Sequence, residues 1–289
     1  MSAQYKFEAI GTGWTIDIDE PISEDKESSL LKLIRSRIDI FDKDYSRFRD
    51  DSLVTEISHH AGTYTMPEDF KPMIDLYRGM YNATSGLMTP LIGRLISDAG
   101  YDKDYSLGEK GSLQSPPDWD SVLQYDHPKL IVKEPVLLDF GAAGKGYLID
   151  IVSRVIEESG IKGYSIDAGG DILHRGKSAV RIGLENPSNT DQAIGVVKLA
   201  NRSICGSSGN RRAWGRFHHI INPKTITSPT EIISIWVIAD STILADALTT
   251  ALFFVEPSDL SEYKFEYLIL NKDFSIIKSA GFPGELFTV

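Results

Sequence analysis

The stretch that most constrains the fold is Leu137–Asp150, which reads LLDFGAAGKGYLID. A short apolar run at 136–138 ends in Asp139, a glycine- and alanine-rich segment follows, and apolar residues at helical spacing continue from Leu148. This pattern predicts a strand, a tight turn and a helix. The free N–H groups at such a helix start favour an anion, and Lys145 adds a positive charge. A Walker A loop and a GxGxxG fingerprint are both excluded by the spacing, so a plain strand-to-helix connection stays open as the alternative.

Charge and composition exclude several classes of partner. The 289 residues carry 41 acidic and 30 basic side chains, a net charge of −11, which argues against nucleic acid or an anionic membrane as a partner. The single cysteine, Cys205, excludes an internal disulfide and a cysteine-based metal cluster. No apolar run approaches the ~20 residues of a membrane-spanning helix, and the N-terminus does not have the pattern of a signal peptide. As written, the sequence predicts a soluble protein.

Strand and helix patterns alternate along the chain without a regular βαβ rhythm. Helical spacing is found at 23–42, with Ser23 as a candidate N-cap, in a short helix capped by Asp51 or Ser52, at 69–84, after 144 and at 240–255. Strand patterns are found at 14–20, 163–172, 180–184, 193–199, 203–206, 232–239, 265–270 and 274–279. The segment 99–127 is rich in Gly, Ser, Pro and Asp and is expected to be a long surface excursion. These patterns favour an α+β fold with mixed sheets packed with helices, in one domain spanning 1–289.

The clearest chemical pair is Asp246 and Thr250, four residues apart on an expected helix and therefore neighbours on one face. A carboxylate and a hydroxyl together suit a hard cation such as Mg²⁺ better than zinc. The alternative is structural: Asp246 satisfies amides in the first turn of its own helix, and Thr250 bonds back to a carbonyl. The apolar surroundings favour the cation site, because a buried carboxylate needs a partner.

His218 and His219 precede an apolar segment, and either could act as a general base near neutral pH. A zinc site is not expected, because no third ligand stands at a suitable spacing. The second pair, at 59–60, lies in a polar loop and is expected to be solvated. The segment 207–209, Ser-Ser-Gly, does not have the GxSxG pattern of a serine nucleophile and is better interpreted as a turn that offers hydroxyls and amides to a ligand.

In this order, the motifs resemble those of the ApbE-type FAD:protein FMN transferases, a family of flavin transferases. The matching blocks are 10–12 (IGT), 45–52 (YSRFRDDS), 86–95, 139–150 followed by 163–172 (ending DAGGDI), and the C-terminal group of 207–209 (SSG), 218–223 (HHIINP) and 245–251 (ADALTTA). The resemblance spans nearly the whole chain. It implies an ApbE-like fold of two closely packed lobes with the flavin site between them.

The resemblance also assigns site residues. Magnesium would be held by Asp246, Thr250 and the backbone carbonyl of Ala142. The FAD contacts would fall on Ile10, Phe48, Leu87, Met88, Thr89, Asp139, Lys145 and Ile221. The base would come from the histidine pair, and His219 is the choice, because strand alternation would place it on the same face as Ile221.

The implied function is Mg²⁺-dependent transfer of FMN from FAD to a Thr or Ser hydroxyl of an acceptor flavoprotein, with release of AMP. Two alternatives stay open: an FAD pyrophosphatase, which forms FMN and AMP, and a non-catalytic flavin-binding protein. The chain departs from the family pattern at Ile10, which replaces Met, at Thr89, which replaces Asp, and at Asn222, which replaces Asp. The family's lipoprotein signal is missing, so a cytoplasmic enzyme is expected as written, and a periplasmic or membrane-anchored one if a leader has been trimmed.

Overall fold

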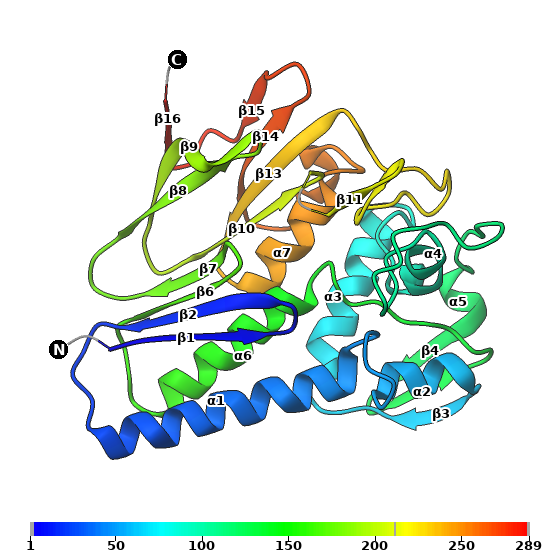
Figure 1. Cartoon of the computed structure of the whole chain (residues 1–289), viewed down its shortest axis with the longest axis horizontal. Coiled ribbons are helices and arrows are strands. Elements are labelled where there is room, and N and C mark those ends of the chain that lie inside the picture. Colours follow the sequence, from blue (N-terminus) through cyan, green and yellow to red (C-terminus); the bar gives the residue numbers. More distant parts are fainter. Residues whose placement is uncertain (1–2, 211, 288–289) are drawn as a thin grey trace.

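A computed structural model describes residues 3–210 and 212–287. Its centre is a large antiparallel sheet, which Figure 1 shows from one side. The strands lie side by side in the order β1 (Ala3–Ala9), β2 (Thr12–Ile18), β6 (Tyr164–Ala168), β7 (Asp171–Arg175), β10 (Ser203–Ser208), β13 (Ile232–Ala239), β14 (Glu266–Asn271) and β15 (Ile276–Lys278). Every neighbouring pair is antiparallel. Because helices and antiparallel strands are combined in this way, the predicted α+β class is confirmed.

The two faces of this sheet are covered differently. The first face packs against two helices, α6 (Gly144–Glu158) and α7 (Thr242–Ala251), and α1 (Glu24–Tyr45) packs against α6 (Figure 1). The second face packs against a smaller sheet of three strands, β8 (Val180–Asn186), β9 (Asn189–Leu199) and β16 (Gly284–Leu286). Strand β13 is apolar at every position except Ser234 because both of its faces are buried: Ile235 and Val237 belong to the helix-side core, and Trp236 and Ile238 to the core between the sheets.

The remaining elements lie beside one end of the large sheet and the helices that cover it. They are α2 (Leu53–His59), α3 (Phe70–Ala83), η1 (Pro90–Ile92), α4 (Gly93–Asp98), α5 (Trp119–Val122), η2 (Pro257–Leu260), a sheet of β3 (Gly62–Thr65), β4 (Leu123–Asp126) and β5 (Lys129–Val132), and the β11 (Ala213–Trp214) and β12 (Phe217–His218) pair. The predicted caps are found, since the Ser23 and Ser52 hydroxyls accept N–H groups of the first turns of α1 and α2. None of the helices in residues 3–210 and 212–287 is long and apolar enough to cross a bilayer.

One prediction of local structure is wrong. The apolar run at 136–138 does not form a strand: Leu138 is fully buried, but the next N–H, that of Asp139, donates to the carbonyl of Pro90 in η1 rather than to a strand (2.8 Å). The strand pattern at 14–20 corresponds to β2, which forms a hairpin with β1 because the chain turns at Ile10 and Gly11, where φ is +44° and +74°. The division into two lobes stays a prediction.

Candidate active site

A cavity of ≈ 230 Å³ lies where the turn before α6, helix α7 and the end of β10 meet. Its wall contains eleven of the twelve site residues predicted from the sequence: Phe48, Leu87, Met88, Thr89, Asp139, Ala142, Lys145, His219, Ile221, Asp246 and Thr250. The twelfth, Ile10, lines a neighbouring cavity of ≈ 370 Å³. The two cavities share part of their walls, including Arg47, Asp139 and Lys145, so they are adjacent. The fold therefore gathers residues that are far apart in the sequence.

Asp246 is held by the helix that packs against its own. Its Oδ2 accepts the backbone N–H of Gly146 in α6 at 2.8 Å. The first turn of α7 is satisfied by a different carboxylate, Asp150, which accepts the N–H groups of Thr242 and Ile243 at 2.9 and 2.8 Å. The alternative in which Asp246 caps its own helix is therefore wrong. Asp246 therefore does not cap α7, and it lines the cavity.

Gly146 is the residue that lets the two helices approach. A Cβ at this position would lie 2.4 Å from the carbonyl oxygen of Thr242 and 2.7 Å from the Cβ of Asp246. No side chain fits there without moving α7. The glycine thus serves the packing of two helices and the placement of Asp246.

The surroundings of Asp246 suit a cation with oxygen ligands. Burial raises the pKa of its carboxyl, while Lys145, the Gly146 N–H and Arg212 lower it. The Thr250 hydroxyl and the backbone of Ala142 line the same cavity, so a carboxylate, a hydroxyl and a carbonyl are available. In the described part of the chain no three His, Cys, Asp or Glu side chains cluster as a metal site. A cation here would therefore complete its shell with phosphate or water oxygens.

Lys145 is not the free cation that the sequence suggested. Its ammonium forms an ion pair with Asp171, which is buried at the start of β7. The other oxygen of Asp171 accepts the N–H of Gly206 on β10 at 3.2 Å. Lys145 therefore links the turn before α6 to the large sheet and still lines both cavities. Asp171 belongs to the DAGGD segment, but nothing in the sequence indicates which cation it pairs with.

Arg47 is a site residue that sequence reasoning missed. Its Nε donates to Asp139, and its guanidinium lies over the Phe48 ring, 4.1 Å from the centroid. The side chain is buried, and its Nη2 has no hydrogen-bond partner in the described residues. In the sequence, the only indication that Arg47 belongs to the site was its position next to Phe48. A buried guanidinium with an unused N–H at the junction of the two cavities suits an anionic ligand.

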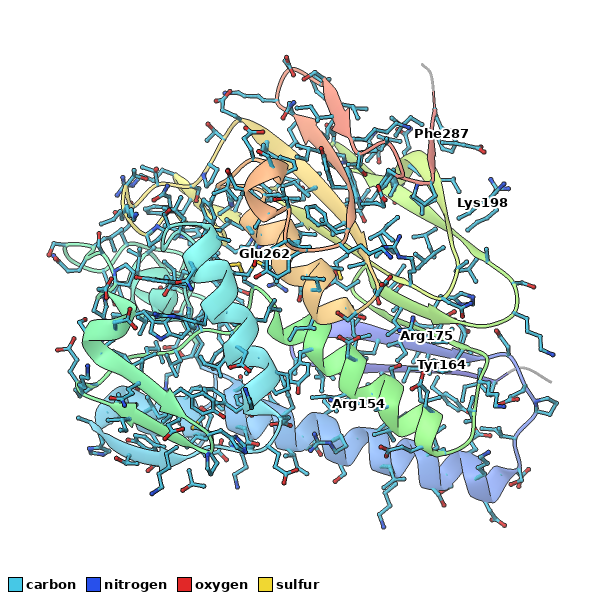
Figure 2. The ribbon with its side chains drawn as sticks, turned by 180° about the vertical axis from the view of Figure 1, so that it is seen from behind. Arg154, Tyr164, Arg175, Lys198, Glu262 and Phe287 are labelled. Atoms are coloured by element: carbon cyan, nitrogen blue, oxygen red, sulfur yellow. The ribbon has the colours of Figure 1, made fainter. Side chains whose placement is uncertain are left out.

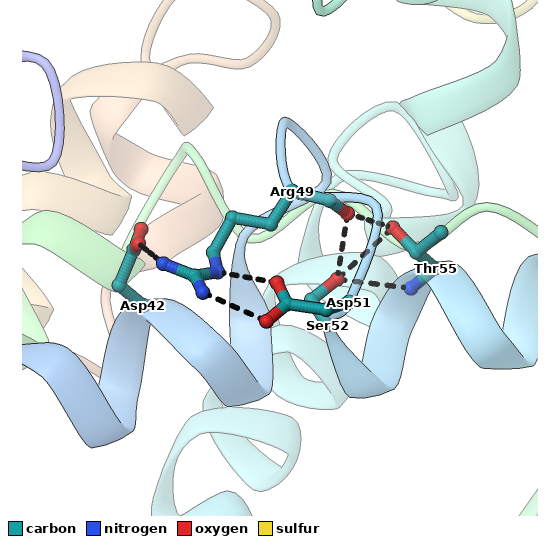
Figure 3. Close-up of polar contacts among 5 residues, drawn as sticks. All are labelled: Asp42, Arg49, Asp51, Ser52 and Thr55. Atoms are coloured by element: carbon teal, nitrogen blue, oxygen red, sulfur yellow. Dashed lines mark hydrogen bonds and ion pairs between the residues drawn. The ribbon is translucent and has the colours of Figure 1, made fainter.

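The turn that carries Arg47 and Phe48 is fixed by the polar contacts drawn in Figure 3. The Arg49 guanidinium donates to Asp42 in α1 and twice to Asp51. Its carbonyl accepts the Thr55 hydroxyl at 2.6 Å, from the first turn of α2. These contacts tie the connection between α1 and α2 to both helices. The Phe48 ring also stacks on Tyr105, which lies in the surface excursion after α4.

Thr89 is placed in the cavity wall as predicted, but its hydroxyl is already engaged. Its Oγ1 accepts the N–H of Leu91 at 3.2 Å and so caps η1. The side chain is buried. Thr89 thus replaces the family's Asp with a group whose polar atom supports the loop.

The two histidines have different surroundings. The His218 Nε2 donates to the Pro229 carbonyl at 2.8 Å, and its Nδ1 accepts the Ile220 N–H at 3.2 Å, so both ring nitrogens are engaged. His219 lines the cavity, and its buried Nδ1 has no partner in the described residues. Burial, followed by the nearby Arg212, His218 and Lys145 charges, lowers the pKa of His219 to about 3. His219 is therefore neutral at neutral pH, and its Nδ1 is left without a protein partner beside the cavity.

Strand alternation does not distinguish His219 from His218, contrary to the prediction. The strand β12 ends at His218, so strand alternation does not extend through 219–221. His219 and Ile221 do lie on one cavity wall, but Ile220 lies there too. The difference between the histidines comes instead from the Pro229 carbonyl and the Ile220 N–H, which engage His218.

Comparison with known proteins agrees with this geometry. The model of the ApbE family matches residues 10–266. The FAD:protein FMN transferases of Klebsiella pneumoniae (strain 342) and Escherichia coli (strain K12) are 23% and 24% identical, over 86% and 88% of this chain and 77% and 78% of theirs. In structure, the chain is similar to the flavin transferase ApbE of Vibrio cholerae (TM-score 0.80, 18% identity, 98% of both chains) and the ApbE protein of Thermotoga maritima (TM-score 0.82, 21% identity, 97% of both chains). Because the family model matches most of its length, the chain belongs to the ApbE family.

Proposed function

We propose that this protein is a Mg²⁺-dependent FAD:protein FMN transferase that attaches FMN, through a phosphoester bond, to a Thr or Ser hydroxyl of an acceptor flavoprotein and releases AMP. The observation that carries the proposal is the convergence in one cavity of a neutral, partly buried His219 with the buried carboxylate of Asp246 and the Thr250 hydroxyl. The names of the relatives at 23% and 24% identity point to the same reaction.

The two adjacent cavities suit a dinucleotide. Their volumes, ≈ 230 and ≈ 370 Å³, together fall in the range of pockets that hold a ligand of this size. The junction between them is lined by Arg47, Lys145 and Arg212, the charges that a pyrophosphate needs. On this proposal the pyrophosphate lies at the junction, with one half of FAD in each cavity.

The chain's own residues would then act as follows. Asp246, Thr250 and the Ala142 carbonyl hold the cation, which neutralises charge on the pyrophosphate when bound. His219 accepts the proton of the acceptor hydroxyl as that oxygen attacks the FMN-side phosphorus. A new O–P bond forms, the P–O bond to AMP breaks, and AMP leaves with the electron pair. Arg47 and Lys145 keep the phosphates in position, which is the main requirement of phosphoryl-type transfer.

Incubation with FAD, Mg²⁺ and a purified covalent flavoprotein in its unmodified form tests the proposal. Intact-mass spectrometry should show that the acceptor gains the mass of one FMN unit, with an equal amount of AMP released. Free FMN and AMP without a change in the acceptor's mass would indicate a pyrophosphatase. Flavin binding without any turnover would indicate a binding protein, and either result would overturn the proposal.

A further inference from the structure

The large sheet has a gap beside the active site. Strand β10 pairs with β13 along its whole length, from Ser203 to Ser208, but its pairing with β7 ends at Ile204. At 206–208 the other edge of β10 has no strand beside it in the described part of the chain, and it faces the tip of the β6–β7 hairpin. The Gly206 N–H points to this side, because it donates to Asp171.

Cavities line both sides of this gap. The segment 206–208 lines the active-site cavity and also a groove of ≈ 310 Å³ between the large sheet and β8. At the hairpin tip, Gly169 lines the first space and Gly170 the second. The gap in the sheet is therefore where the groove meets the cavity.

The far wall of the groove is the edge of a strand. Five consecutive residues of β8, from Arg181 to Glu185, line it. Successive side chains of a strand point to opposite faces, so a space lined by five in a row runs along the strand's edge. In the described chain the segment 181–184 of β8 pairs with β9 alone, so the main chain of this part of the edge is available to a further strand. Added strands are a recurrent way of binding an extended peptide, through main-chain hydrogen bonds.

The acceptor protein needs a route that FAD does not fill. In the proposed function FAD occupies the two adjacent cavities, whereas the groove lies outside them and shares only the segment 206–208 with the active-site cavity. The acceptor hydroxyl must come within hydrogen-bond reach of His219, which lines the same cavity as 206–208. A folded domain is too large for a groove of this size, whereas an extended segment fits between two sheet edges.

We propose that an extended segment of the acceptor protein lies in this groove along the edge of β8 at 181–184 and brings its Thr or Ser hydroxyl past the end of β10 to the active site. The inference rests on the proposed transferase function and adds the location and conformation of the protein substrate.

The groove can be blocked by labelling a single introduced cysteine. Its only cysteine, Cys205, is fully buried, and burial raises the pKa of its thiol well above the usual value, so Cys205 does not react readily with a maleimide. The variant Arg181→Cys places a single accessible thiol on the groove wall. The matched control is Lys198→Cys, because Lys198 is exposed, pairs with Arg181 from the neighbouring strand β9, and does not line the groove. A label there lies one strand farther from the edge of β8. Figure 2 labels Lys198 on the surface of the molecule.

Both variants are tested before and after reaction with a bulky maleimide, using FAD, Mg²⁺ and the unmodified covalent flavoprotein as acceptor. The labelled Arg181→Cys protein should lose about tenfold or more in kcat/KM for the acceptor. Its affinity for FAD should change less than about twofold, because the label lies outside the flavin cavities. The labelled Lys198→Cys protein should transfer FMN at the unlabelled rate.

Three results would overturn the inference: an unchanged rate after labelling at 181, an equal loss after labelling at 198, or a parallel loss of FAD affinity. If the unlabelled protein binds FAD but transfers no FMN, the proposed function fails, and this inference fails with it. The unlabelled reaction therefore tells the two failures apart.

Discussion

Alanine at position 146 should disturb the active site through helix packing. The Cβ of Gly146→Ala would stand 2.4 Å from the Thr242 carbonyl oxygen and 2.7 Å from the Asp246 Cβ. Backbone atoms of α7 cannot rotate away as a flexible side chain can, so α7 has to shift. The shift also disturbs the hydrogen bond from the Gly146 N–H to Asp246. We therefore expect both stability and cation affinity to fall.

Two opposing effects set the size of the change. Alanine in a helix is favoured over glycine by about 0.5–1 kcal/mol. Overpacking of a tight contact costs about 1–3 kcal/mol, and contact with a backbone carbonyl belongs to the upper half of that range. The free energy of unfolding should therefore fall by about 1–2.5 kcal/mol, the difference between the two effects.

The matched control is Gly144→Ala, two residues earlier in the same helix. A Cβ there would meet its nearest neighbour, the Phe140 Cβ, at 3.5 Å, an ordinary contact, so this variant should be neutral or slightly more stable. Urea denaturation measures the free energy of unfolding, and Mg²⁺ titration of FMN transfer measures cation affinity. The packing argument would be refuted if both alanine variants had the same stability, or if Gly146→Ala left both quantities unchanged.

Further predictions concern the charged groups of the site. Lys145→Ala should lower the free energy of unfolding by about 3 kcal/mol, because it leaves the buried Asp171 without its cation. Adding Asp171→Asn should restore most of that loss, and no restoration would contradict the ion pair. Asp246→Asn, which keeps an acceptor for the Gly146 N–H, should abolish turnover and Mg²⁺ dependence without unfolding; wild-type turnover would disprove the metal assignment. In single-turnover transfer at saturating FAD, His219→Ala should lose roughly 10²–10⁴-fold in rate, whereas His218→Ala should mainly lower stability, and the reverse pattern would exchange their roles. Because the folded-state pKa of His219 is about 3 and its ordinary value is 6.5, the unfolded chain binds more protons between these values. Stability from this group is thus fully present above pH 6.5 and is lost as the pH falls toward 3, so denaturation midpoints of His219→Ala should fall less over this window than those of the wild type.

Local sequence patterns correctly predicted those strands and helix caps that depend only on residues close by in the sequence. The strand Ile232–Ala239 was predicted with its observed bounds, because a segment with seven apolar residues out of eight, rich in β-branched side chains, forms a strand buried on both faces. The caps at Ser23 and Ser52 depend only on neighbouring residues and are also confirmed. The run at 136–138 has the same local character as a strand, but no strand lies beside it.

The site was predicted as a set of residues but not as a set of contacts. Motif order was enough to name residues that line the cavities, from Ile10 to Thr250. The partner of Lys145, the role of Arg47 and the capping of α7 by Asp150 depend on which segments the tertiary fold brings together. A sequence shows that a carboxylate is present but not which amide or cation it meets.

The contacts between α6 and α7 also bear on the order of folding. The bonds from Gly146 to Asp246 and from Thr242 to Asp150 join residues 100 and 92 positions apart. Closing a loop of that length costs about 4 kcal/mol of chain entropy, more than a single hydrogen bond returns, so these bonds cannot start folding. Strands β6, β7, β10 and β13 must first bring the two helices together. The cation site should therefore be among the last parts of the chain to assemble.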